Sequence, residues 1–419
     1  MSRVYLIGSG PLPSGDPSEL GFPQLRTAQF LGPLLEAGHE VMLACLTRRG
    51  LDGPGDREAV GRPTTMTVAT SRGERRCDYV VVRPDEPGRF LALRDHRRDF
   101  APDVTVTAGP FLPMAAGARA AGDEPLWIDV PGDPMCEAQA KAHRSGSADP
   151  IHRYRQMFGQ ALARGDRFSV ISGAQRGALV GALGLAGRLT AEAAGHELVH
   201  VVRGSVEGLP AAAPDHAAPV GLHRLPGDAV VVLFCGGYNN WLDGDTMLAG
   251  LLGAMERRPD LHFVSTGGAL PGHDEGTYHR VRSGAEASAH ADRFHFLGWI
   301  PLHSLPPVFA RARVTLSIDR PVYEAEFGAR TRILESLERG VPVVSTDLCE
   351  LTHELAAEGL LTVVRPADPA QLTAALLALD GTPDRTAVQA DWAKQRARYS
   401  PAETTAPLLR WVQAPARAP

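Results

Sequence analysis

The chain has 419 residues, of which 44% are hydrophobic and 22% charged, a composition typical of a folded globular protein with room for two domains. A net charge of −5 without a sustained basic run argues against nucleic acid or an anionic membrane surface as the main partner. No apolar run approaches the roughly 18 residues that span a bilayer, and the N-terminus begins with a strand pattern instead of a signal peptide. We therefore expect a soluble, cytoplasmic protein.

The sequence contains no sign of a structural metal or a disulfide framework. Its five scattered cysteines, an odd number without paired metal spacing, fit the reduced thiols of a cytoplasm. The fifteen histidines are dispersed, and no compact set of His, Cys and carboxylate residues is present. We predict neither a metal nor a cofactor.

In the first half, short apolar strands alternate with helical patterns, as in a parallel sheet wound with helices on both faces. The first strand leads into a loop rich in glycine and proline and then into a helix over roughly 24–37. Strands are expected at 4–7, 40–45, 79–82, 104–107, 126–130, 168–171 and 198–202. These elements predict a Rossmann-like domain over residues 1–207.

Residues 208–227 are rich in Ala and Pro, show little periodicity and predict an interdomain linker. The alternation of strands and helices then restarts. Strands are expected at 229–234, 261–266, 294–297, 314–318, 341–344 and 361–364, and helices at 245–257, 369–379 and 401–412. We predict a second Rossmann-like domain over 228–395, and an α/β fold with two doubly wound sheets.

The most informative segment, residues 323–346, joins an acidic loop to a helix and then to a buried strand. The helix is expected to begin near Ala329 or Arg330 and to end at Gly340. Because a helix start offers unpaired N–H groups and a partial positive charge, phosphate is favoured there, with Arg330 and Arg332 adding full charges. Glu326 and Glu335 would border this ligand, which suggests sugar hydroxyls.

This segment resembles the fingerprint of the retaining nucleotide-sugar glycosyltransferases of the GT-B fold, in particular the GT4 family. That fingerprint runs Glu-x-Phe-Gly, then a helix with a second Glu, then Gly-x-Pro-Val-Val. The resemblance implies two domains facing across a cleft, with residues 396–419 forming a helix that returns to the N-terminal domain. It assigns the ribose to Glu335, and the donor sugar to Glu326 or alternatively Glu324. Backbone groups predicted to hold the diphosphate are those of Gly328, Ala329 and Thr331.

The same resemblance places the nucleotide base near residues 297–300, where Trp299 and Ile300 would line its site. Core packing is the alternative for Trp299. In the first domain, the loop around Gly10 faces the ligand and allows close backbone approach. Arg26, on the helix that follows, either reaches the donor or covers the helix.

One departure from the family is chemically large. Relatives place an Arg and a Lys after the first strand of the second domain, whereas this chain has uncharged residues there. Gly236, Gly237 and Tyr238 can offer backbone N–H groups to the donor at this position, and Asn239 and Asn240 can offer side-chain amides, but none of them carries a positive charge. We therefore expect Arg330 and Arg332 to supply the charge for the diphosphate. The alternative is that both arginines pair with neighbouring glutamates in a surface network.

A second departure concerns the strand exit at 127–139, where many relatives carry a His close to the reacting carbon. Asp129 and Asp133 are the candidates in its place, with Asp133 as a catalytic or orienting residue. The alternative is that Asp133 only begins a turn before Pro134. Glu137 and Gln139 fall on the next helix and are further candidates for acceptor binding.

The resemblance implies an enzyme that transfers a sugar from a nucleoside diphosphate sugar to a small-molecule or natural-product acceptor, with retention and without a metal. Two alternatives stay open. One is a lipid-linked or polysaccharide-building transferase, and the other is a pseudo-glycosyltransferase that binds nucleotide without ordinary sugar transfer. The sequence leaves the base (UDP, GDP, ADP or dTDP), the sugar, the acceptor and the oligomeric state undetermined.

Overall fold

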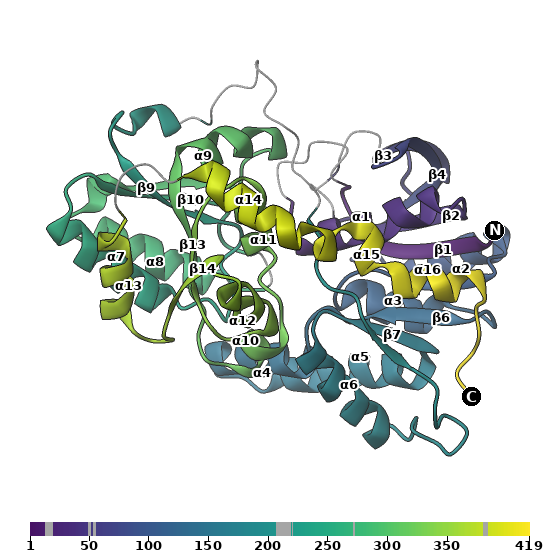
Figure 1. Cartoon of the computed structure of the whole chain (residues 1–419). Helices are drawn as coiled ribbons and strands as arrows, with labels where there is room; N and C mark the ends of the chain where they lie inside the picture. Colours follow the sequence, from purple (N-terminus) through teal and green to yellow (C-terminus); the bar gives the residue numbers. More distant parts are fainter. Residues whose placement is uncertain are drawn as a thin grey trace. The chain divides into compact units, whose positions relative to one another are not determined.

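The computed structural model describes residues 1–12, 20–48, 52, 56–206, 219, 221–270, 273–379 and 384–419. The chain divides into two compact units, each containing one sheet (Figure 1). The first consists of Met1–Gln139, Ser147–Glu207 and Arg398–Pro419, and the second of Ala140–Gly146 and Gly208–Ala397. Of the predicted linker, residues 208–218 and 220 lie outside the described residues.

Within the described residues, the sheet of the first unit has eight strands in the order β3-β4-β2-β1-β5-β6-β7-β8. Its strands are β1 (Arg3–Ser9), β2 (Glu40–Leu46), β3 (Thr64–Thr70), β4 (Gly73–Val82), β5 (Val104–Thr107), β6 (Leu126–Asp129), β7 (Arg167–Val170) and β8 (Val199–Val201). All neighbours are parallel except β3 and β4. Every strand predicted here is present, whereas β3 was not predicted because its threonine-rich sequence has no apolar run.

The strand order reverses between β1 and β5, which makes their carboxyl ends the topological switch point of this sheet. The helices of the first unit are α1 (Phe22–Glu36), α2 (Arg89–Phe100), α3 (Leu112–Ala120), α4 (Pro134–Ser145), α5 (Asp149–Arg164), α6 (Gly173–Leu185), α15 (Pro401–Thr404) and α16 (Ala406–Gln413). Of these, α4 begins in the first unit and ends in the second. Figure 1 shows α15 and α16, in yellow, beside α1 and β1. Leu408, Trp411 and Val412 of α16 are part of the first unit's core.

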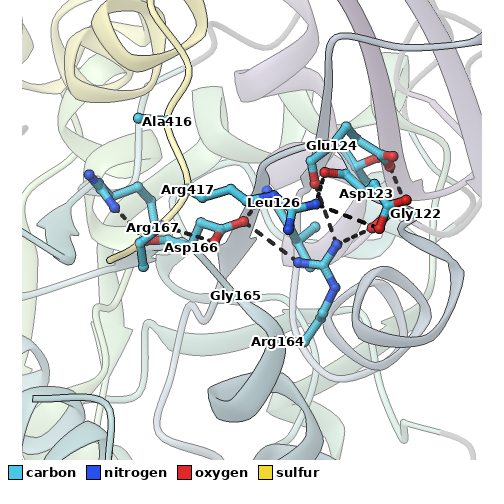
Figure 2. A network of polar contacts seen from close by, with 12 residues as sticks. Gly122, Asp123, Glu124, Leu126, Arg164, Gly165, Asp166, Arg167, Ala416 and Arg417 are labelled. Carbon is cyan, nitrogen blue, oxygen red and sulfur yellow. Dashed lines mark hydrogen bonds and ion pairs between the residues drawn. The ribbon is translucent and has the colours of Figure 1, made fainter. Parts of the chain in front are cut away.

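The C-terminal tail is tied to the first unit by a polar network (Figure 2). The amide of Ala418 donates to Asp166 Oδ1 at 3.0 Å, next to the start of β7. Arg164 approaches Asp166 Oδ2 at 3.6 Å, and Arg417 donates to the carbonyl of Asp123 before β6. These contacts lie where β6 and β7 begin. The tail therefore lies at the end of the sheet opposite to the carboxyl ends of the strands.

The sheet of the second unit has six parallel strands in the described residues, in the order β11-β10-β9-β12-β13-β14. They are β9 (Val230–Cys235), β10 (Leu261–Thr266), β11 (Phe294–Gly298), β12 (Ala312–Ser317), β13 (Val343–Thr346) and β14 (Leu361–Val364). All six were predicted. The order reverses between β9 and β12, so the switch point of this sheet lies at their carboxyl ends.

The α-helices of the second unit are α7 (Gly244–Arg257), α8 (Gly276–Glu286), α9 (Leu305–Arg311), α10 (Tyr323–Phe327), α11 (Arg332–Glu338), α12 (Glu350–Ala357), α13 (Pro369–Leu377) and α14 (Arg385–Arg396). Short 3-10 helices span Leu222–Arg224, Ala291–Arg293, Leu302–Ser304 and Ala397–Tyr399. Aspartate side chains cap several starts, as at Asp243 before α7 and Asp368 before α13. Together the units confirm the predicted α/β fold with two doubly wound sheets.

The prediction was wrong about where the helix in the informative segment begins. Residues expected to form a loop are the short helix α10, and α11 begins at Arg332 instead of near Ala329. The turn between them is closed by the amide of Gly328, which donates to the carbonyl of Glu324 at 2.9 Å. The face of α11 that carries Ile333, Leu334 and Leu337 is buried as predicted.

Candidate functional site

The candidate site is built around the switch point of the second sheet, where the loop after β9 meets the residues after β12. The amide of Asp243 donates to the carbonyl of Ile318 at 2.9 Å, and the amide of Arg320 donates to the carbonyl of Trp241 at 2.7 Å. These bonds hold the loop at 236–243 against the exit of β12. Ligands of open α/β sheets bind at this kind of position.

Arg330 does not present its charge to this loop as a free cation. Its side chain is buried, its Nε donates to Asp319, and its Nη2 donates to Glu324 Oε2 at 3.0 Å. Burial alone would lower the pKa of Arg330, but the two carboxylates raise it above its usual value. The predicted role of Arg330 at the diphosphate is corrected accordingly, because these two carboxylates already compensate its charge. Arg330 instead fixes α10 and the start of α11 to the exit of β12.

Arg332 is different because it forms no ion pair with the described residues, and Asp319 acts on it only as a more distant charge that raises its pKa. Its guanidinium lies over the ring of Phe234, with Cζ 4.7 Å from the ring centroid, and its Nη2 donates to the carbonyl of Gly237 at 3.3 Å. Its Nη1 is buried without a hydrogen-bond partner, and no carboxylate among the described residues forms an ion pair with it. Burial lowers the pKa of Arg332. The positive charge thus lies at the exit of β9, where the sequence has no basic residue.

Gly236 lies beside this guanidinium. Gly236 has φ of 120°, which disfavours any other residue, and a β-carbon added there would lie 3.8 Å from Cζ of Arg332. The amides of Gly236 and Tyr238 are used within the protein, by the carbonyls of Thr266 and Gly268 respectively. They are therefore not free for a ligand, contrary to the prediction.

The side chains of this loop differ in how they are used. The hydroxyl of Tyr238 is fully buried and lies 2.7 Å from Ser265 Oγ, so Tyr238 supports the core. Asn239 is half-buried. Asn240 is only 4% exposed, and its Nδ2 has no hydrogen-bond partner among the residues that the structure describes.

Glu335 lies on α11 and accepts a hydrogen bond on Oε1 from Arg339 Nε at 2.8 Å. Its side chain is 20% exposed, and burial raises its pKa to about 7 although Arg339 opposes the shift. The charges of Glu335 and Arg332 both act on the pKa of Cys235 at the end of β9. The three residues therefore lie near one another. The partner Arg339 was not predicted, although its spacing of four residues from Glu335 is the helical signal for such a pair.

The raised pKa of Glu335 predicts a pH-dependent contribution to stability. Because the folded chain binds this proton more tightly than the unfolded chain, the contribution is present at low pH and is lost as pH rises through about 7. We expect Glu335→Gln to stabilise the protein by about 1–2 kcal/mol at pH 8 and by nothing at pH 4. Urea unfolding at several pH values measures this. A Glu335→Gln stability difference that does not change with pH would contradict the shift.

The other residues of the informative segment have separate positions. Glu326 is exposed on α10 and makes no side-chain hydrogen bond with the described residues, whereas Glu324 is buried against Arg330. Gly328 is buried, and Ala329 and Thr331 are half-buried. Since α11 has only seven residues, we assign no anion site to its N-terminus alone.

After β11, Trp299 and Ile300 are both half-buried. The indole Nε1 of Trp299 donates to the carbonyl of Ala269 at 3.3 Å, across the turn that follows β10. Ile300 packs against the core around Leu233 and Val264. Trp299 is therefore fixed to this turn by its indole nitrogen, and both residues retain partly exposed surface.

In the first unit, Asp129 has a structural position that differs from the predicted one at the acceptor. Its carboxylate is fully buried and forms a bidentate ion pair with Arg26, whose Nε lies 2.9 Å from Oδ2 and whose Nη2 lies 2.8 Å from Oδ1. It also accepts bonds from Ser169 Oγ at 2.6 Å and from the amide of Gly109 at 3.0 Å. With both oxygens used and no surface exposed, Asp129 is not available to an acceptor. Arg26 is equally buried and does not face the donor.

Asp133 lies directly before α4, which begins at Pro134, and its side chain bonds to the first amides of that helix. Its Oδ1 accepts from the amides of Met135 and Cys136, both at 2.9 Å, while its Oδ2 accepts no bond from the described residues. Glu137, one turn later, is buried and accepts from the hydroxyl of Tyr154 at 3.3 Å. Gln139 is exposed.

The loop after β1 is held to the strand beside it. The amide of Gly10 donates to the carbonyl of Leu46, and its carbonyl accepts from Gln24 Nε2, both at 3.1 Å. Residues 13–19 of the same loop lie outside the described residues. Near the switch point of this sheet, Phe111 has φ of 52° and ψ of −76°. This backbone conformation is strained, and no sequence pattern predicted it.

Neither a metal cluster nor a membrane span is found in the part of the chain that the structure describes. No group of three or more His, Cys, Asp or Glu residues there is arranged to hold a metal ion. No helix there is long and apolar enough to cross a membrane.

The second unit contains the part of the sequence that matches a known family. Residues 229–380 match the family model described as "Glycosyl transferases group 1". This part of the chain is similar to glycosyltransferases. The match supports the predicted glycosyltransferase activity, although no curated protein sequence matches the chain significantly.

Solved structures resemble the chain over its whole length. Sucrose-phosphate synthase from Thermosynechococcus elongatus matches with a TM-score of 0.66 and 16% identity, over 99% of this chain and 100% of that one. HepE from Anabaena, in complex with UDP-glucose, matches with a TM-score of 0.68 and 13% identity over the same shares. The UDP-forming trehalose-phosphate synthase from Burkholderia vietnamiensis matches with 0.62 and 12%, over 99% of both chains. At these identities the likeness shows the fold alone, and it confirms the predicted GT-B fold.

Proposed function

We propose that the protein transfers a sugar from a nucleoside diphosphate sugar to a small-molecule or natural-product acceptor. The observation that carries this proposal is the guanidinium of Arg332 at the exit of β9, whose Nη1 is buried without a hydrogen-bond partner among the described residues and which forms no ion pair with them. A buried cation without a counter-charge is costly, and an anionic ligand removes that cost. The diphosphate of a nucleotide sugar supplies such a charge, and the family match over 229–380 supports the same class of substrate.

The remaining donor contacts follow from the positions of the side chains around Arg332. Glu335 is the carboxylate for the ribose hydroxyls, and Glu326, which is exposed, is the carboxylate for the sugar. Trp299 and Ile300 offer partly exposed apolar surface for the base. Arg330 acts indirectly, by holding α10 and α11 in place.

The proposed reaction needs stabilisation of negative charge more than a strong base. The bond between the sugar's anomeric carbon and the β-phosphate oxygen breaks, and its electron pair leaves with the diphosphate. A bond then forms from that carbon to an acceptor oxygen, whose proton passes to a phosphate oxygen on the same face of the sugar, which gives retention. Arg332 stabilises the diphosphate as its charge grows, and no metal is required for this step.

For the acceptor, we propose Asp133, Glu137 and Gln139 of the first unit as the contacts. Asp133 is the strongest of the three because its Oδ2 is free of hydrogen bonds with the described residues. This oxygen is suited to accept a bond from an acceptor hydroxyl and so to orient it. Asp129 is excluded from this role by its burial against Arg26.

A nucleotide panel tests the proposed function. Titration calorimetry with UDP, GDP, ADP and dTDP should show binding of one of them, and the corresponding sugar nucleotides should be turned over with release of that nucleotide. If none of the four binds and none is released, the proposed function is wrong. Binding without release from any sugar donor would instead favour a pseudo-glycosyltransferase.

A further inference from the structure

A second polar group at the exit of β9 lacks a partner, besides Arg332. Asn240 is 4% exposed, and its Nδ2 makes no hydrogen bond with the described residues. Buried amide nitrogens are nearly always hydrogen-bonded, because an unpaired one loses its bond to water without a replacement. The terminal oxygen and nitrogen of an asparagine can be exchanged by a half-turn, and in the orientation seen in the structure the nitrogen is the buried atom without a partner among the described residues.

The backbone around Asn240 is fixed on both sides. The amide of Leu242 donates to the carbonyl of Asn239 at 3.1 Å, and the amide of Arg320 donates to the carbonyl of Trp241 at 2.7 Å. The guanidinium of Arg330 lies over the Trp241 ring, with Cζ 5.5 Å from its centroid. The backbone at Asn240 is therefore held at the switch point of the sheet, where its side chain is only 4% exposed to water.

The unpaired atoms of Asn240 and Arg332 belong to the same loop environment. Arg332 bonds to the carbonyl of Gly237, three residues before Asn240 in the loop that follows β9. One group is a cation and the other a neutral donor, and the described residues contribute no carboxylate in an ion pair with this arginine. Two buried donors without acceptors match the chemistry of an oxyanion that both would bind.

We propose that Asn240 is a positioning residue for the donor, whose side-chain amide donates a hydrogen bond to a diphosphate oxygen while Arg332 supplies the charge. This inference rests on the proposed function and deepens it. The leaving group is then held by one full charge and one neutral donor. The neutral donor adds direction to the binding without adding charge, so it fixes the diphosphate for departure and leaves the released nucleotide less tightly held than two cations would.

Asn240→Ala and Asn240→Asp test the assignment, with binding of UDP, GDP, ADP and dTDP and the rate of nucleotide release as readouts. We expect Asn240→Ala to weaken binding of the preferred nucleotide and to lower kcat/KM for its sugar by about 10- to 100-fold, the range for one lost bond to a charged group. Its melting temperature should be unchanged or higher, because the variant removes an unpaired buried group. Asn240→Asp should lose more than Asn240→Ala, because a carboxylate repels the diphosphate.

Gln395→Ala is the matched control, because Gln395 on α14 also has a buried amide atom, Oε1, without a partner in the described part of the chain. It should leave nucleotide binding and kcat/KM unchanged. The inference is overturned if Asn240→Ala binds and turns over the nucleotide sugar as the wild type does, or if its activity falls only in proportion to a lowered melting temperature. A wild type that neither binds nor releases any of the four nucleotides refutes the proposed function itself.

Discussion

Replacing Arg332 by alanine should lower kcat by about 100- to 1,000-fold, the range for loss of one preorganised group that stabilises charge in the transition state. Binding of the preferred nucleoside diphosphate should weaken in parallel. The melting temperature should not fall, because Nη1 of the wild-type guanidinium is buried and unpaired and the side chain forms no ion pair with the described residues. Steady-state kinetics and differential scanning fluorimetry measure both effects.

Arg320→Ala is the matched control for this prediction. Arg320 lies near the same strand exits, but its side chain bonds to the carbonyl of Leu242 and to Asp245 Oδ2 at 2.9 Å. Its charge is therefore compensated, and the variant should change kcat by less than about threefold. Arg332→Lys should recover part of the activity, because it restores the charge without the planar fork of donors. Equal activity in Arg332→Ala and the wild type would contradict the assignment.

Asp129→Ala should destabilise the first unit by about 3–5 kcal/mol, because it leaves Arg26 as a buried charge without its counter-charge. The amide of Gly109 and the hydroxyl of Ser169 lose their acceptor in the same variant. Urea unfolding followed by hydrogen exchange, read separately for the peptides of each unit, measures the effect. The second unit should keep its protection.

Two variants separate this effect from a general loss of charge. Asp95→Ala removes an exposed pair with Arg98, whose atoms lie 3.0 Å apart, and should cost less than about 0.5 kcal/mol. The double variant Arg26→Met with Asp129→Leu should be more stable than Asp129→Ala, because neither charge is left alone. If Asp129→Ala kept wild-type stability and lost only its activity toward acceptor substrates, Asp129 would be an acceptor contact after all.

The fold was predictable from sequence because its strands are apolar runs and its sheets are parallel. Parallel strands are buried on both faces, so runs such as Val230–Cys235 and Leu261–Thr266 stand out from the helices between them. The strand that was missed, β3, is the antiparallel edge strand and has mostly exposed residues. The hydrophobic pattern of the sequence therefore predicts a strand where the strand is fully buried, and it misses a strand that is only partly buried.

The candidate site was predictable only in part. The family resemblance located Glu335, and the helical pattern around it located the buried face of α11. It did not distinguish Arg330 from Arg332, although they lie two residues apart. That difference depends on Asp319, which comes from another strand exit and gives Arg330 its second carboxylate.

The sequence by itself determined the alternation of strands and helices, the two sheets and the positions of the charged residues along the chain. Tertiary structure decided which of those charges are already compensated. Arg26 with Asp129, and Arg330 with Asp319, are pairs between residues that are distant or unpatterned in sequence, and burial makes each pair obligatory. Arg332 has no such pair in the described residues, and for that physical reason we propose that its charge serves a ligand.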